Sequence, residues 1–157
     1  MYRSPSFGGL TVDVGTILKG NDAAATAGDQ SKLDLGATYA AGPLTASLAY
    51  NKVSGAVKNV ALGAKYNFGT FAVAGSFQDP AGAKKGFTVG VSAPVGPVTL
   101  TADFARATDT ANKNTDFLLE AKYALSKRTF AYGVYMKDGA VAGKSTNGYA
   151  VGVRHNF

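Results

Sequence analysis

Most of the chain alternates apolar residues with small or polar residues at every second position. The run 33–39 shows this clearly, with Leu33, Leu35, Ala37 and Tyr39 set against Asp34, Gly36 and Thr38. A period of two is typical of a β-strand whose two faces meet different surroundings, and a helical period fits none of these runs. The pattern predicts ten strands, over residues 8–18, 31–40, 44–52, 58–68, 71–78, 86–94, 97–107, 115–125, 129–137 and 147–157.

The links between these runs alternate in length. Short turns with glycine, proline or small polar residues lie at 41–43, 69–70, 95–97 and 126–128, and longer polar links lie at 19–30, 53–57, 79–85, 108–114 and 138–146. Short periplasmic turns opposite longer extracellular loops are typical of outer-membrane barrels. We therefore expect a single domain over residues 1–157, built as an up-and-down meander.

The residue types on the two faces of the predicted strands favour a membrane protein over a soluble one. A soluble barrel would carry Lys, Glu and Gln outward, whereas the non-apolar face here is mostly Gly, Ala, Ser, Thr and Asn with a few charges. Aromatic residues fall at both sets of strand ends, as the two bilayer interfaces require: Tyr39, Phe68, Phe71, Tyr123, Phe130 and Phe157 at one, and Tyr50, Phe77, Phe87, Phe104, Phe117 and Tyr149 at the other. We predict an all-β, closed antiparallel transmembrane β-barrel of ten strands. A soluble β-sandwich or lipocalin-like barrel is the alternative.

The interior of such a barrel decides whether it conducts. Eight strands give an interior that side chains can fill, whereas sixteen leave a water channel. The inferred inward residues are mostly small, and they include Ala131 and Gly133, with Leu118 and Tyr135 as large exceptions. We therefore expect a narrow open channel.

Charged residues on the inward parity would line this channel. They are Asp13, Lys32, Asp34, Lys65, Asp103, Glu120, Lys122 and Arg154, together with Lys19, Asp116 and Lys137. The signs nearly balance, which argues against strong ion selectivity. Lys65, Lys122 and Arg154 fall in the half near the short turns, where Asp13 is the main counter-charge, so we expect a modest anion preference.

Composition narrows the function further. The net charge is +6, but the sixteen Lys and Arg are scattered without a basic cluster longer than two, so we expect no nucleic-acid partner. The absence of cysteine excludes disulfides and Cys-based zinc sites. The sequence has no stretch of 18 apolar residues that would predict a transmembrane helix. Met1 does not begin a cleavable leader, so we expect either a mature form or an engineered one.

Enzymatic chemistry has little support in this sequence. A general base near neutral pH would most readily be a histidine, and the one histidine, His155, is expected to face lipid headgroups at the periplasmic rim. Asp103 and Glu120 could form a carboxylate pair, but Lys65 and Lys122 share their face, so we interpret them as channel charges. We expect no catalytic residue, no cofactor and no metal site.

Two segments resemble the Gram-negative general porins. The start, Tyr2-Arg-Ser-Pro-Ser-Phe-Gly-Gly-Leu10, is similar to an internal segment of those porins, and the end, Tyr149-Ala-Val-Gly-Val-Arg-His-Asn-Phe157, is similar to their final strand. The resemblance covers the C-terminal ten strands of a sixteen-stranded fold. It implies a minimal or truncated porin without the six strands that carry the constricting loop and much of the trimer contact.

The resemblance also implies partners and a location. In the porin family the last strand is the outer-membrane assembly signal, which here corresponds to Tyr149, Val151, Val153 and Phe157 and would be read by the barrel assembly machinery. We expect a bacterial outer-membrane protein, surrounded by lipid and lipopolysaccharide. We expect a monomer, with a trimer as the other possibility.

The function expected from these features is passive diffusion of ions and small polar solutes through the barrel. The alternative is a barrel without a conducting pore that acts as an adhesin or surface-binding scaffold through its loops. Adhesins usually need longer and more aromatic loops, and only the link 19–30 exceeds about ten residues.

Overall fold

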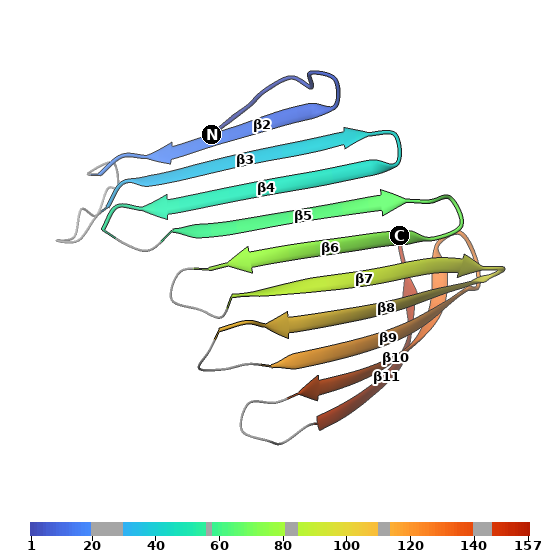
Figure 1. Ribbon diagram of the computed structural model, residues 1–157. Helices are drawn as coiled ribbons and strands as arrows, with labels where there is room; N and C mark the ends of the chain where they lie inside the picture. Colours follow the sequence, from blue (N-terminus) through green and yellow to red (C-terminus); the bar gives the residue numbers. More distant parts are fainter. Residues whose placement is uncertain (20–29, 56–57, 81–84, 110–113, 140–145) are drawn as a thin grey trace.

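The structure is a computed structural model, and it describes the chain except for residues 20–29, 56–57, 81–84, 110–113 and 140–145. It is one antiparallel sheet of eleven strands in chain order (Figure 1). The strands are β1 (Tyr2–Arg3), β2 (Leu10–Ile17), β3 (Lys32–Ala41), β4 (Leu44–Val53), β5 (Asn59–Asn67), β6 (Ala72–Asp79), β7 (Gly86–Val95), β8 (Val98–Ala107), β9 (Thr115–Ala124), β10 (Thr129–Gly139) and β11 (Thr146–His155).

The meander was predicted, but the count of ten strands is wrong by one. The ten long strands, β2 to β11, all lie on the predicted runs. The additional strand β1 contains only Tyr2 and Arg3, which pair with Val14 and Asp13 of β2. Two residues cannot display an alternation, so the sequence pattern contains no signal for this strand.

The prediction of a closed barrel is also wrong. The sheet ends at β1 on one side and at β11 on the other, and the contacts among the described residues join only consecutive strands. The last strands curve away behind the others, yet the two edges stay apart (Figure 1). Closure requires that strand number, tilt and curvature agree. Alternation along a strand fixes which face a residue takes, but it does not fix how strongly the whole sheet bends.

Glycine and proline shape two of the short turns. Gly42 and Gly96 have φ values of +54° and +60°, and each is followed by a proline. Glycine reaches this left-handed region without steric cost, and proline fixes the next φ near −65°. A two-residue link of this type suits the twist of a hairpin, so β3–β4 and β7–β8 close tightly.

The cross-strand register assigns every side chain of the long strands to one of two faces. The face that carries Asp34, Gly36 and Thr38 of β3 is called the polar face, and the face that carries Leu33, Leu35 and Tyr39 is called the apolar face. No large hydrophobic residue among those described is buried. The sheet is therefore a single layer, and the apolar face has no protein packed on it. Within the same residues, no helix is long and apolar enough to cross a membrane.

Candidate functional site: the polar face of the sheet

All eight charged residues predicted to face the interior lie on the polar face. The pairings carry this face from strand to strand through Asp13–Gly36, Asp34–Asn51, Lys65–Ala74, Gly90–Asp103, Thr101–Glu120, Thr99–Lys122 and Phe130–Arg154, and Lys32 shares the parity of Asp34. They are spread over six strands and form no single cluster. This arrangement gives the polar face charges of both signs along its length.

Strand β10 faces the opposite way from the prediction. Its register places Ala131, Gly133, Tyr135 and Lys137 on the apolar face, beside Tyr123, Ala121, Leu119 and Phe117 of β9. The polar face instead receives the large residues Phe130, Tyr132, Val134 and Met136. The inward assignments of Ala131, Gly133, Tyr135 and Lys137 are therefore wrong, and so is the place of Phe130 in an apolar-face aromatic row. Both parities of this strand hold apolar residues, so alternation alone could not choose between them.

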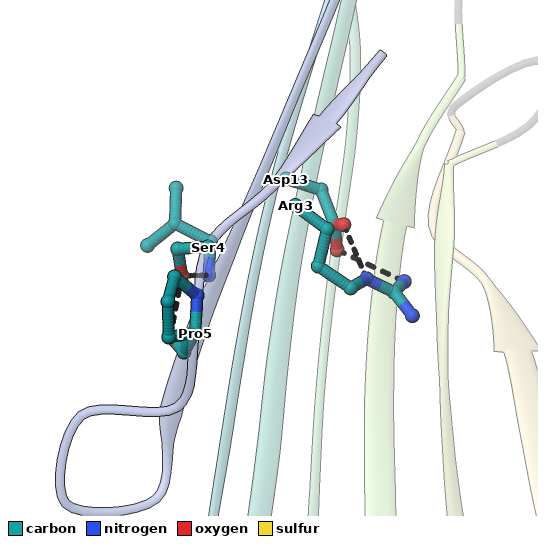
Figure 2. A network of polar contacts seen from close by, with 5 residues as sticks. Arg3, Ser4, Pro5 and Asp13 are labelled. Carbon is teal, nitrogen blue, oxygen red and sulfur yellow. Dashed lines mark hydrogen bonds and ion pairs between the residues drawn. The ribbon is translucent and has the colours of Figure 1, made fainter.

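Arg3 also lies on the polar face, although the alternation pattern of the sequence did not predict it. Its Nε donates to Oδ1 of Asp13 at 2.6 Å, and Nη2 lies 3.3 Å from Oδ2 (Figure 2). Ser4 holds this segment beside β2, because its Oγ accepts from Val12 N at 2.9 Å and donates to Pro5 O at 2.8 Å. Asp13 is mostly covered, with 15% of its side chain exposed, while Arg3 is 70% exposed. The charge of Asp13 is therefore compensated locally.

A second polar row involves Asp34. Asn51 Nδ2 donates to Oδ1 of Asp34, and Asn59 Nδ2 donates to Oδ1 of Asn51 at 2.9 Å. These residues come from β3, β4 and β5, so the row crosses three strands. The hydrogen bond from Asn51 holds the Asp34 carboxylate in place without cancelling its charge.

The basic residues near the short turns differ in their partners. Lys122 Nζ forms an ion pair with Oε1 of Glu120 at 2.8 Å and lies 5.9 Å from the centroid of the Phe130 ring. In the part of the chain that the structure describes, no ion pair includes Lys65 or Arg154. These two cations therefore contribute most to any positive potential at this end of the polar face.

Glycines let several acidic side chains lie close to the sheet. Asp13 is opposite Gly36, Asp34 is opposite Gly15, and Asp103 is opposite Gly90. A Cβ at Gly36 would lie 3.3 Å from the Cβ of Asp13, and a Cβ at Gly90 would collide with the Asp103 carboxylate. The glycines thus keep space above the polar face open. A hollow of about 380 Å³ lies over β2–β6, lined largely by small residues such as Ser47, Ala61 and Gly63.

The apolar face carries aromatic residues toward both ends of its strands. Toward the long links, the register links Phe77 with Phe87 and Phe104 with Phe117, and Tyr135 faces Tyr149 with ring centroids 5.2 Å apart. Near the short turns, the Phe68 ring lies 4.6 Å from that of Tyr66 and 4.7 Å from that of Phe71. Aromatic residues at two levels with aliphatic residues between them match the two interfaces of a bilayer.

The remaining sequence candidates are placed as follows. His155 Nδ1 lies 2.8 Å from Oγ1 of Thr129, and its ring meets the Phe157 ring edge-on at 5.0 Å. Glu120 pairs with Lys122 and not with Asp103. Among the described residues, no group of His, Cys, Asp or Glu is arranged to hold a metal ion. The residues of the expected assembly signal are strongly exposed on or beyond β11, with Tyr149 at 79%, Val151 at 89% and Val153 at 68% exposure, and Phe157 fully exposed.

Solved structures with the same fold include porins. The chain superposes on the anion-selective porin from Comamonas acidovorans with a TM-score of 0.74 and 29% sequence identity, over 99% of this chain and 58% of that one. A triple mutant of the Rhodopseudomonas blastica porin matches with a TM-score of 0.77 at 18% identity, over 97% of this chain and 53% of that one. A loop-deletion mutant of OmpT, an outer membrane protein of Vibrio cholerae, gives 0.70 at 14% identity, over 98% and 61%.

The chain thus spans between half and about three fifths of the length of these proteins. A comparison with curated protein sequences finds no match. The sequence model of the Gram-negative porin family matches residues 1–143, which include β1 to β10. The family match agrees with the superpositions and with a sheet that has one polar face and one apolar face with two aromatic levels. The chain belongs to the Gram-negative porin family and is a protein of the bacterial outer membrane.

Proposed function

We propose that the chain forms part of the wall of a passive diffusion channel for ions and small polar solutes. The observation that carries this proposal is the contrast between the two faces of one sheet, since the polar face holds charges and small residues while the apolar face holds aliphatic and aromatic ones. In a bilayer the apolar face lies against lipid, and the polar face then lines water.

We also propose a modest preference for anions. Asp13 of β2, the acidic residue expected to offset Lys65 and Arg154, is compensated by Arg3 at 2.6 Å. Lys65 and Arg154 are in no ion pair among the described residues, so their charge is available to permeating ions. A narrow, low-dielectric passage strengthens the local field of such charges. The Comamonas acidovorans porin, which is similar to this chain, is itself described as anion-selective.

Single-channel recording in a planar bilayer tests both parts. The open sheet supplies only part of a channel wall, so the recording uses the protein in an assembled form that closes the wall. This form should show discrete conductance steps, and its reversal potential in a salt gradient should favour the anion. Lys65→Glu together with Arg154→Glu should move the reversal potential toward cations, because both side chains lie on the polar face.

The matched control is Lys52→Glu with Arg106→Glu, which makes the same change in net charge on the apolar face. At 1 M salt, where charges are screened within about 3 Å, this control should leave the reversal potential near its original value. A closed, membrane-inserted assembly without conductance steps would contradict the channel and favour a surface-binding scaffold. An equal shift in both double variants would contradict the assignment of the polar face to the pore.

A further inference from the structure

The orientation of β10 places a row of large apolar side chains on the polar face. This row, called the apolar stripe, consists of Phe130, Tyr132, Val134 and Met136. The first three are partly exposed, and Met136 is 42% exposed. From Phe130 to Met136 the stripe extends about 20 Å at 3.3 Å per residue. Contiguous apolar side chains on a water-facing surface typically mark a binding site.

The neighbouring strand β11 leaves space beside the apolar stripe. The residues of β11 that lie opposite the stripe on the polar face include only small ones above Arg154, namely Gly152, Ala150 and Gly148. A Cβ at Gly148 would meet no atom within 4 Å. A flat solute therefore has room to lie over β11 with one side against the stripe.

A cationic group stands at the end of the stripe near the short turns. Arg154 of β11 is directly opposite Phe130, and it is exposed. Lys122 Nζ lies 5.9 Å from the centroid of the Phe130 ring, but it is already paired with Glu120 at 2.8 Å. No ion pair in the described part of the chain includes Arg154. The planar guanidinium of Arg154 is therefore the group available to bind a carboxylate, which it can do through two parallel hydrogen bonds.

We propose that the apolar stripe and Arg154 bind small aromatic carboxylates on their way through the channel. The carboxylate pairs with Arg154, and the ring lies against Phe130 and Tyr132, whose centroids are 6.3 Å apart. Aromatic rings attract one another at centroid distances of about 4.5–7 Å, so a third ring fits this pair. An inorganic anion would gain only from Arg154, a sugar would leave the charge unmatched, and an apolar protein segment over the stripe would do the same. The inference rests on the proposed channel and names its substrate class.

The test adds benzoate to the assembled form that closes the channel wall while its chloride current is recorded. Bound benzoate should interrupt the current, and the dependence of these interruptions on concentration gives a dissociation constant. Gluconate has the same charge but a hydroxylated body, and cyclohexanecarboxylate has a ring that is not aromatic. Both should interrupt the current more weakly than benzoate does. Gluconate as effective as benzoate would overturn the role of the stripe, and cyclohexanecarboxylate as effective as benzoate would overturn the aromatic class.

Variants of the stripe test the aromatic contact. Phe130→Leu with Tyr132→Leu should weaken benzoate binding about two- to tenfold, because each aromatic pair contributes beyond the apolar area that it buries. The matched control is Phe77→Leu with Tyr135→Leu, which removes one Phe and one Tyr from the apolar face and should leave the affinity unchanged within about twofold. Phe130→Leu alone leaves the contact of Tyr132 with Gly152 intact and should weaken binding in the same direction. Equal weakening by both double variants would overturn the contact path.

A charge variant tests the carboxylate contact. Arg154→Gln should weaken benzoate binding about tenfold, as expected for the loss of a charge-assisted pair, while the chloride steps persist. Arg106→Gln makes the same change on the apolar face and should not alter benzoate binding. Unchanged binding in Arg154→Gln would overturn the proposed site. Chloride steps without any effect of benzoate would contradict the substrate class alone, whereas a closed assembly without chloride steps would contradict the channel and this substrate class together.

Discussion

A tyrosine covers a glycine on the polar face, and this contact shows how single residues fix the sheet. Tyr132 of β10 is opposite Gly152 of β11. A Cβ placed on Gly152 would lie 2.6 Å from the Tyr132 hydroxyl oxygen and 2.7 Å from its Cζ. The outer end of the ring therefore lies over Gly152, a contact that stabilises glycines in β-sheets and helps to fix register.

Gly152→Val should consequently destabilise the folded protein. The added side chain forces the Tyr132 ring away, at a cost of about 1–3 kcal/mol in free energy of unfolding, typical of overpacking. Urea unfolding in lipid vesicles measures this change. Gly148→Val on the same strand and face, where a Cβ meets nothing within 4 Å, is the control and should cost much less. Tyr132→Ala should relieve the effect of Gly152→Val, and equal losses at both glycines would contradict the contact.

For single residues, the alternation of residues along each strand was enough to place most charged residues of the candidate site on one face. The eight predicted charges needed only the rule that alternate residues share a face, and the register places them all on the polar face. Arg3 was missed because its strand is two residues long. The ion pair of Lys122 with Glu120 joins residues two apart on one strand, so parity permits it, but only the side-chain geometry shows it.

Among the elements, β10 is the one whose orientation could not be predicted from its own sequence. It presents Phe130, Tyr132, Val134 and Met136 on one parity and Ala131, Gly133 and Tyr135 on the other, so both sets contain apolar residues. Hydrogen bonding to β9 and β11 decides the faces, because a shift of one residue would exchange every side chain between them. Orientation in this strand is thus set by its neighbours.

Cysteine labelling checks the orientation of β10 directly. The chain has no cysteine, so each introduced thiol is the only one present. In lipid vesicles, Val134→Cys on the polar face should react with a charged, membrane-impermeant thiol reagent, and Tyr135→Cys on the apolar face should react far more slowly. Glu120→Cys and Leu119→Cys of β9 give the reference rates for the two faces. If Tyr135→Cys reacted faster than Val134→Cys, the orientation of β10 predicted from the sequence would be correct after all.

For the whole molecule, the main departure from the sequence prediction is the open sheet. The positions of ten strands follow from their alternation, but closure depends on twist and tilt summed over all strands, which no local pattern contains. The chain superposes on 58% of the Comamonas acidovorans porin, so an equivalent sheet is only part of that longer chain. The resemblance to a family of larger barrels carried more information on closure than the strand pattern did.

Disulfide trapping separates the open sheet from a ten-stranded barrel. A disulfide needs Cα atoms within about 7 Å. Val151→Cys should therefore form no disulfide within one chain when combined in turn with Val12→Cys, Val14→Cys or Thr16→Cys, which cover the apolar face of β2. Val151→Cys with Gly133→Cys, directly opposite in β10, is the positive control. Non-reducing gels and intact mass give the readout. A β2–β11 disulfide within a single chain would show that the barrel closes.

The strictly sequential strand order has a consequence for how such proteins change size. Every contact between strands in the described residues joins elements that are neighbours along the chain. No strand is threaded between two that are distant in sequence, so a hairpin can be duplicated or deleted while all other pairings keep their partners. Removing a single strand would instead reverse the direction of all that follow. The number of strands should therefore change by two at a time, both in evolution and in engineered variants, because a whole hairpin is gained or lost.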